Sequence, residues 1–314
     1  MKKVSNSKVL KLWSLIFAAS LTVASFAGCG SSGNDTSSTA SQTSTAASAS
    51  DEGSKADDTD ASKSDDNSEA NTETVTIKGI TDLTPHSELI EFVIPKLKEQ
   101  GVNVELVSTA ADSTTNEKLA NGEIDFNFFQ HYPYLNSENE VNGWDLVNAG
   151  DIHVEPITAY SDKYATVDEI PDGAVVSIPN DGTNEFRALR ILEENGFIEL
   201  DPSVNDSLSA DVKSITNYKK NIQIIEQDSA QIIPTKDDYD FFITNTNKAL
   251  EAKITSNKLF SESAKNNPYA NIIAVRKEDK DSDAIKKLVA ALQSDETRKF
   301  IEDTYDGAVI PVEK

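Results

Sequence analysis

The chain contains few of the residues on which many enzymes and cross-linked secreted proteins depend. Its 314 residues include one cysteine and three histidines, so an intramolecular disulfide is excluded and stability must come from packing. This scarcity, together with the lack of a Gly-x-Ser-x-Gly elbow, argues against hydrolase chemistry. The sequence also lacks a glycine-rich phosphate loop, a Cys-x-x-Cys motif and an internal repeat. We therefore expect neither catalysis nor a cofactor.

Positive charge is scarce as well. The chain has 29 lysines and arginines against 53 acidic residues, for a formal net charge of −24. Without residues 1–28, which contribute four lysines and no acid, the charge is about −28. Such a chain repels nucleic acid, which we exclude as a partner. It also repels an anionic lipid surface, so contact with a membrane must depend on something other than charge.

The first 28 residues have the layout of a secretory signal. Four lysines precede an apolar run over residues 12–26. This run is shorter than the about 20 apolar residues that cross a bilayer, which favours cleavage over a membrane span. It ends in small residues directly before Cys29 and so resembles a bacterial lipobox, although Phe26 stands where leucine is usual. The resemblance implies a diacylglycerol on Cys29, cleavage before it, and an extracytoplasmic chain anchored to the cell membrane by lipid.

Residues 30–74 have no aromatic side chain and no aliphatic side chain larger than alanine. Such a segment cannot bury enough apolar surface to offset the entropy lost on ordering. We expect residues 29–74 to form a disordered tether that begins at the lipidated cysteine. As a flexible coil, its ends would lie about 40 Å apart.

The remaining 240 residues, 75–314, alternate between strand-like and helix-like patterns. Strands are predicted at residues 75–80, 102–107, 124–129, 175–178, 222–226, 241–245 and 272–276. Helices are predicted at residues 85–100, 184–194, 282–293 and 295–304, with a further helix ending over residues 116–121. This alternation predicts an α/β fold with mainly parallel sheets flanked by helices.

The length of this region allows two lobes. We predict that residues 75–158 and 262–314 form the first lobe and residues 159–261 the second. The chain would cross between them near residues 156–161 and 245–272. In open α/β sheets ligands bind beyond the carboxyl ends of the strands, so two facing lobes predict a ligand in the cleft between them.

Three polar and aromatic segments follow predicted strands, and their residues resemble those of a known family. The segments are NFFQHYPYL at 127–135, IPNDGTNEFRAL at 178–189 and FFITNTN at 241–247. Together they resemble the NlpA/MetQ-type methionine-binding lipoproteins. The similarity extends along nearly all of residues 75–314, including Thr-Pro-His at 84–86, Val-Glu-Pro at 154–156, Pro-Tyr-Ala-Asn at 268–271 and Gly-Ala-Val at 307–309.

The resemblance implies a solute-binding protein of an ABC importer rather than an enzyme. It implies a two-lobed, periplasmic-binding-protein-like fold of type II and a cleft that holds methionine or a closely related amino acid. The implied partners are this amino acid, with L-methionine the first choice, the importer's permease, and the membrane through the lipid anchor. We expect a monomer whose lobes close on the ligand, a motion that the importer would recognise.

Amino-acid chemistry supports candidate residues for this cleft. A buried zwitterion needs partners for its carboxylate and its ammonium. Arg187 can hold a carboxylate with both arms of its guanidinium, and the surrounding helix start offers free N–H groups. Most helix arginines instead form surface ion pairs, but the position of Arg187 after a strand favours the cleft.

Amide and carboxylate side chains supply further candidates, Asn184, Glu185 and Asn245. Asn245 matches an asparagine that the family uses for ligand, and Asn247 in the same segment is an additional candidate. Glu185 could equally be a helix-start residue that complements the helix dipole.

Phe129, His131 and Tyr134 are expected to line the side-chain pocket, because thioether sulfur packs well against aromatic rings. Ordinary core packing is the alternative, and it is the one we expect for Phe128, which points to the opposite face of its strand.

Two departures from relatives bear on the ligand. Asp112 stands where relatives usually carry an aromatic residue, and Lys248 where they commonly have tyrosine. An altered wall could admit a D-amino acid, a short methionine-containing dipeptide or another residue. Other functions also stay open: three histidines with acids could bind zinc, although no two have helical ligand spacing. A surface adhesin would have no ligand in the cleft.

Overall fold

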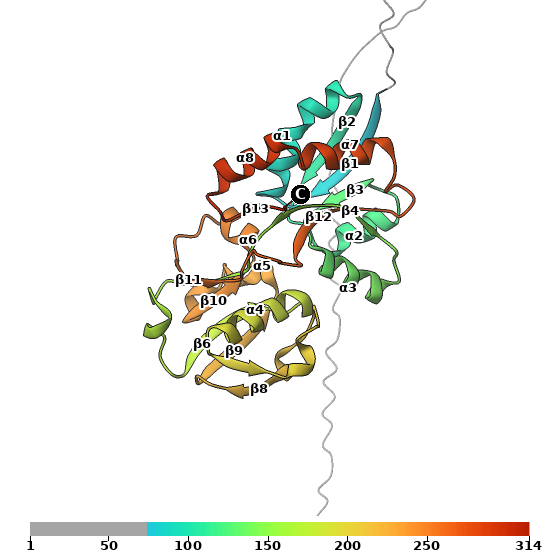
Figure 1. Ribbon diagram of the computed structural model, residues 1–314. Coiled ribbons are helices and arrows are strands. Elements are labelled where there is room, and N and C mark those ends of the chain that lie inside the picture. Colours follow the sequence, from blue (N-terminus) through green and yellow to red (C-terminus); the bar gives the residue numbers. More distant parts are fainter. Residues whose placement is uncertain (1–73, 314) are drawn as a thin grey trace, which may run out of the picture. The chain divides into compact units, whose positions relative to one another are not determined.

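A computed structural model describes residues 74–313 (Figure 1). The predicted signal, the lipidation site at Cys29 and the tether up to residue 73 lie outside the described residues. Two main sheets organise the described part, and each is built around three parallel strands. Among residues 74–313, no helix is both long enough and apolar enough to cross a membrane.

The first sheet contains six strands in the order β13-β4-β12-β3-β1-β2. Strands β1, β2 and β3 are parallel, whereas β12 runs antiparallel to both β3 and β4 and β13 runs antiparallel to β4. Their bounds are Val75–Thr81 for β1, Val102–Ser108 for β2, Phe126–Phe128 for β3, Val147–Val154 for β4, Ala270–Val275 for β12 and Ile310–Pro311 for β13.

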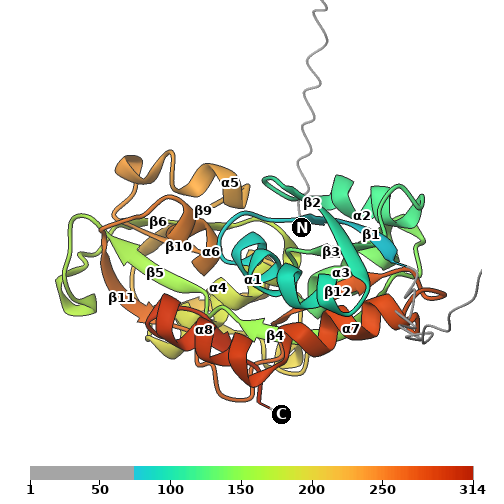
Figure 2. The same ribbon diagram turned by 90° about the horizontal axis from the view of Figure 1, so that it is seen from above.

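Helices cover both faces of this sheet. One face packs against α1 (His86–Glu99), α7 (Asp283–Leu292) and α8 (Asp295–Tyr305), which lie beside it in Figures 1 and 2. The other face packs against α2 (Ser113–Ala120) and α3 (Tyr132–Asn142). Alternation along β12 supplies both cores, because successive side chains of a strand point to opposite faces: Ile273 and Val275 enter the first core, and Ile272 and Ala274 the second.

The second sheet has five strands in the order β11-β5-β10-β6-β9. Strands β9, β6 and β10 are parallel, and β5 is antiparallel to β10 and β11. Helix α4 (Gly182–Glu194) buries its apolar side against this sheet, and the short α5 (Ser229–Ile232) packs against β6 and β10. The strand bounds are Thr158–Ser161 for β5, Ala174–Pro179 for β6, Ile222–Gln227 for β9, Phe241–Thr244 for β10 and Asn257–Ser261 for β11.

Smaller elements complete the described part. Strands β7 (Ile198–Leu200) and β8 (Ile215–Tyr218) form an antiparallel pair, and α6 (Thr246–Glu251) directly follows β10. Short 3-10 helices lie at Val167–Glu169, Pro202–Val204, Val212–Ser214 and Lys236–Asp238. The chain passes between the two main sheets after β4 and again after β11.

The α/β fold class predicted from the sequence is confirmed, and every predicted strand and helix overlaps an observed one. The sequence did not predict α3, because this helix buries only Pro133 and Leu135 and has little apolar periodicity. Nor did the sequence predict β4, whose first half is only partly buried. A second difference from the prediction is that antiparallel strands lie beside the three parallel strands of each sheet. They include β4, β5 and β11, which lie next to the crossings between the sheets.

Candidate ligand-binding cleft

A cavity of about 310 Å³ is lined by residues that follow strands of both sheets. Six of the seven residues predicted to bind ligand line it: Phe129, His131, Tyr134, Asn184, Arg187 and Asn245. The sequence placed them in three distant segments, and only the fold brings them together. The cavity has the size of a site for a small organic molecule.

Helix α4 supplies one wall, and its first turn is tightly fixed. Asp181 is the N-cap residue, and its carboxylate accepts the backbone N–H of Asn184 at 2.9 Å and the hydroxyl of Thr183 at 2.8 Å. The side-chain nitrogen Nδ2 of Asn184 also donates to the two oxygens of the Asp181 carboxylate, at 2.9 and 3.2 Å. Because the amide nitrogen is bound to Asp181, the amide oxygen of Asn184 must face the cavity.

Three donors converge on that oxygen. His131 Nε2 lies 3.1 Å from Asn184 Oδ1, Arg187 Nη1 donates to it at 3.1 Å, and Asn245 Nδ2 donates to it at 2.9 Å. An amide oxygen has two lone pairs, so three donors exceed what it can serve well. Three N–H donors thus share a single acceptor, an arrangement that also suits a carboxylate, whose two oxygens accept several hydrogen bonds.

His131 acts as a neutral donor in this group. Its Nδ1 accepts the backbone N–H of Tyr134 at 3.1 Å, so the proton of the neutral ring lies on Nε2 and points at Asn184. Burial, followed by the positive charge of Arg187, lowers the pKa of His131 to about 4. Near neutral pH the imidazole contributes a hydrogen bond and no charge.

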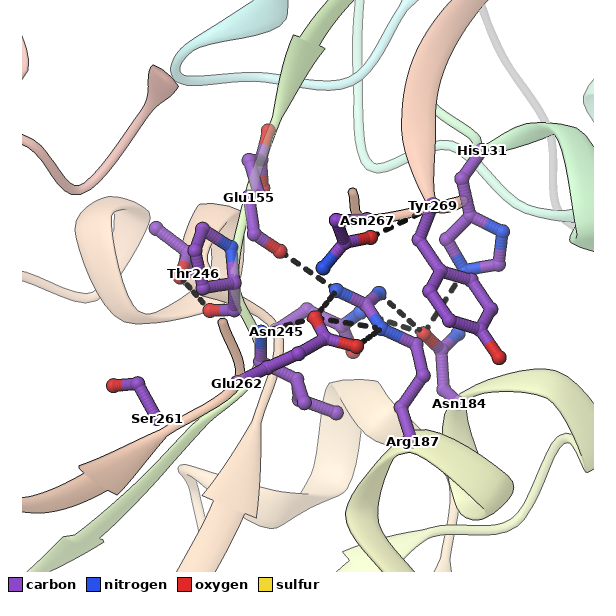
Figure 3. Close-up of polar contacts among 12 residues, drawn as sticks. His131, Glu155, Asn184, Arg187, Asn245, Thr246, Ser261, Glu262, Asn267 and Tyr269 are labelled. Carbon is purple, nitrogen blue, oxygen red and sulfur yellow. Dashed lines mark hydrogen bonds and ion pairs between the residues drawn. The ribbon is translucent and has the colours of Figure 1, made fainter. Parts of the chain in front are cut away.

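Arg187 is held on every side (Figure 3). Nε and Nη2 both donate to the Glu262 carboxylate, with the shortest contact at 2.7 Å. Nη2 also donates to the backbone oxygen of Glu155 at 2.7 Å, and the guanidinium carbon lies 4.6 Å from the centre of the Tyr269 ring. The two-armed grip that we expected for the ligand is thus already taken by Glu262. One N–H of Nη1 is left for a ligand.

The aromatic candidates divide as the alternation along β3 predicts. The ring of Phe129 lies at the cavity and meets Tyr134 edge to face at 6.2 Å between centroids. His131 contacts Tyr134 and Tyr269 in the same manner, at 6.2 and 5.1 Å. Phe128 is fully buried in the core of the first sheet.

Glu185 is the one predicted site residue that the structure places outside the cavity lining. Its Oε1 accepts the backbone N–H of Val212 at 2.7 Å, on a side of α4 different from that of Asn184 and Arg187. Burial raises the pKa of Glu185 to about 7, and the nearby Glu226 adds to the rise. Residues three apart share a helix face, whereas the next residue is turned by about 100°.

The other side of the cavity carries Asp112 and Lys248, the two residues at which we expected this chain to depart from the family pattern. Lys248 pairs with Asp82 at 2.9 Å, and Asn247 Nδ2 donates to the same carboxylate oxygen at 2.7 Å. These contacts join α6 of the second sheet to the end of β1. Asp112 caps α2 and also lines the cavity.

A second cluster adjoins the cavity through Glu155, which lines it. His153 Nε2 is 2.7 Å and His86 Nε2 is 3.5 Å from Glu155 Oε1, and all three side chains are buried. Two histidines and a glutamate are plausible zinc ligands, but metal-bound histidines normally donate their second ring N–H to an acceptor. Within residues 74–313, Nδ1 of each histidine has no hydrogen-bond partner. The cluster therefore fits a hydrogen-bonded support for Glu155 better than a metal site.

Several groups at or near the cleft were not predicted from the sequence. Glu262 and Tyr269, which fix Arg187, and Asp82, which joins the two sides, received no role. Glu155 and Asn271, which line the cavity, also received no role. Both residues and Tyr269 lie in short motifs that contributed to the family resemblance, so the sequence did carry a signal for them. Nothing in the local pattern of Glu262 points to Arg187, which lies 75 residues away in the chain.

Fold and cavity together define a class: a two-lobed α/β protein with a cavity between two sheets that are joined by paired crossings. A family model described as NlpA lipoprotein matches residues 78–313. The chain belongs to the NlpA lipoprotein family.

Individual relatives agree with this assignment. The chain is 40% identical to the methionine-binding lipoprotein MetQ of Bacillus subtilis, with 73% of this chain and 85% of the relative covered. It is 36% identical to the D-methionine-binding lipoprotein MetQ of Escherichia coli K12, covering 67% and 78%. A nutrient-binding protein from Burkholderia cenocepacia, solved bound to methionine, has a TM-score of 0.71 and 36% identity, with 76% of this chain and all of that chain covered.

Proposed function

We propose that this chain is the solute-binding lipoprotein of an ABC importer and that its cleft binds methionine or a closely related amino acid. The convergence of His131, Arg187 and Asn245 on one amide oxygen carries the proposal. A ligand carboxylate at this point would receive the N–H groups that Asn184 alone cannot serve well. The choice of ligand is supported by two relatives that are named as methionine-binding lipoproteins and by a similar structure that was solved bound to methionine.

The proposed ligand-binding set is Phe129, His131, Tyr134, Asn184, Arg187 and Asn245. Phe129 and Tyr134 would contact the ligand's side chain, because aromatic rings attract thioether sulfur by roughly 0.3–1.5 kcal/mol per contact. Glu185 leaves the set, because its carboxylate binds the backbone on another side of α4.

The lobes in this proposal are residues 75–158 with 262–314 and residues 159–261. Asn184 and Asn245 belong to the second and His131 to the first, so contacts to one ligand would complete only when the lobes approach. The importer's permease would distinguish this closed form from the open one.

The ligand is tested by mass spectrometry of whatever leaves the purified protein on denaturation, followed by calorimetry on refolded protein. L-methionine, D-methionine, a methionine-containing dipeptide and zinc chloride are the four ligands. We expect tight binding of a methionine stereoisomer and none of zinc. Zinc binding without methionine binding would favour a metal carrier, and binding of none of the four would favour an adhesin.

Anchoring follows from Cys29. Diacylation there would hold the protein on the extracytoplasmic side of the cell membrane, since two acyl chains give stable attachment. Cys29→Ser should move the protein from the membrane fraction to the medium or periplasm while leaving methionine affinity unchanged. A variant that stays in the membrane fraction would contradict the anchor.

A further inference from the structure

Glu262 forms an ion pair with Arg187 at the edge of the cleft, although Glu262 does not line the cavity itself. The Arg187 side chain is 2% exposed and that of Glu262 is 15% exposed, so the pair is largely removed from water. The shortest contact, between Arg187 Nη2 and Glu262 Oε2, is 2.7 Å. At such burial two opposite charges interact strongly and are seen by a third group as one nearly neutral unit.

The surrounding chain keeps this pair in place. Glu262 follows β11 at one crossing, and its backbone N–H donates to the oxygen of Ile157 at the other crossing, at 3.0 Å. The backbone N–H of Ile157 in turn donates to Glu262 Oε2 at 3.3 Å. Displacing Glu262 from Arg187 would break these contacts and leave a buried carboxylate unpaired, which is costly. A ligand carboxylate would therefore meet Arg187 with Glu262 still bound.

The donors that remain for the ligand are electrically balanced. His131 donates as a neutral ring, Asn245 donates through an amide, and the remaining Nη1 hydrogen of Arg187 belongs to a compensated pair. A site of this kind gives hydrogen bonds to a carboxylate without offering a net positive charge. It suits a ligand whose own net charge is zero.

We propose that Glu262 is a specificity-determining residue, which makes the cleft select zwitterionic amino acids over the corresponding carboxylic acids that lack the amino group. This inference rests on the proposed function. Glu262 acts through Arg187 and does not itself touch the ligand. Without its charge, the guanidinium of Arg187 would be uncompensated and would attract the carboxylate of any ligand beside it, including those of deaminated compounds.

The test compares L-methionine with 4-(methylthio)butanoate, which has the same carboxylate and side chain and no ammonium. Glu262→Gln keeps a side-chain oxygen for Ile157 but adds one net positive charge beside the carboxylate. The anion should bind roughly tenfold or more tightly as a result, because a unit charge close to the ligand in a partly buried site interacts with it strongly. Methionine should change little, since its ammonium is repelled as its carboxylate is attracted.

The measured quantity is the ratio of the two dissociation constants from calorimetry. Glu199→Gln is the matched control, because Glu199 is a half-exposed glutamate on β7 that pairs with Lys219. The ratio should shift by about tenfold toward the anion in Glu262→Gln and stay constant in Glu199→Gln. A role of Glu262 in merely orienting Arg187 would weaken both ligands equally and leave the ratio unchanged, which would overturn the inference.

Two further variants keep the test decisive if Glu262→Gln folds poorly. Arg187→Gln leaves the Glu262 charge alone and should move the ratio toward methionine. The double variant Arg187→Gln with Glu262→Gln removes both charges and should return the ratio to that of the wild type. A ratio in the double variant that does not return to that of the wild type also contradicts the inference. Failure of the wild type to bind methionine at all would instead overturn the proposed function and this inference with it.

Discussion

Replacing Arg187 with alanine should damage both stability and binding, and the structure gives a magnitude for each. The substitution removes five hydrogen bonds, two of which share the Nε hydrogen, and leaves the carboxylate of Glu262 largely buried without its counter-charge. Breaking a buried ion pair by removing one partner costs about 3–5 kcal/mol in the free energy of unfolding. For a folded region of this size that corresponds to a fall in melting temperature of roughly 6–20 °C.

Binding should weaken independently of this loss. The ligand carboxylate would lose the Nη1 donor and would face an uncompensated Glu262, for which we expect a cost of about 2–5 kcal/mol. That range is roughly a 30- to 5,000-fold rise in the dissociation constant. Calorimetry with L-methionine, performed well below the melting temperature of the variant, measures it.

The control is Arg190→Ala on the same helix. Arg190 pairs with Glu193 at 2.6 Å, and its side chain is 35% exposed, so both stability and affinity should change little. If Arg187→Ala lowers the melting temperature but leaves the affinity within threefold of the wild type, Arg187 supports only the fold. The assignment of the cleft would then have to be rebuilt without it.

Three further outcomes are expected. The pKa of Glu185 is about 7 in the folded state and near 4.5 in the unfolded chain, so the contribution of Glu185 to stability falls as pH rises from 4.5 to 7. Glu185→Gln should therefore raise the melting temperature more at pH 8 than at pH 5 and leave the methionine affinity unchanged. A reduced affinity would return Glu185 to the site. The pKa of His131 is near 6.5 in the unfolded chain and about 4 in the folded state, so the free energy of unfolding should fall as pH drops from 6.5 to 4. His131→Gln should make the free energy of unfolding, measured by urea titration, depend less on pH in this range. An unchanged pH dependence would mean that His131 is charged in the folded state. Gly79→Ala would place a Cβ 2.1 Å from the Phe126 ring and should lower the free energy of unfolding by about 1–3 kcal/mol, whereas an unchanged urea midpoint would mean that the ring moves freely.

The sequence alone predicted the α/β class from local patterns, and it predicted six residues that line the cavity from their places after strands and from the family resemblance. Apolar alternation and helical periodicity identify strands and helices wherever one side is buried, as in α1 and α7. Polar and aromatic residues just after predicted strands indicated His131, Asn184 and Asn245, since the ends of parallel strands gather at one edge of a sheet.

Tertiary structure decided what each of these residues contacts. Asn184 and Arg187 face the cavity and Glu185 does not, although all three lie within four consecutive residues, because packing of α4 on the second sheet sets which side of the helix is free. Arg187 meets Glu262 only because two crossings bring residues 75 positions apart into contact. Charge compensation inside a cleft depends on such distant pairs, and no local pattern in the sequence records them.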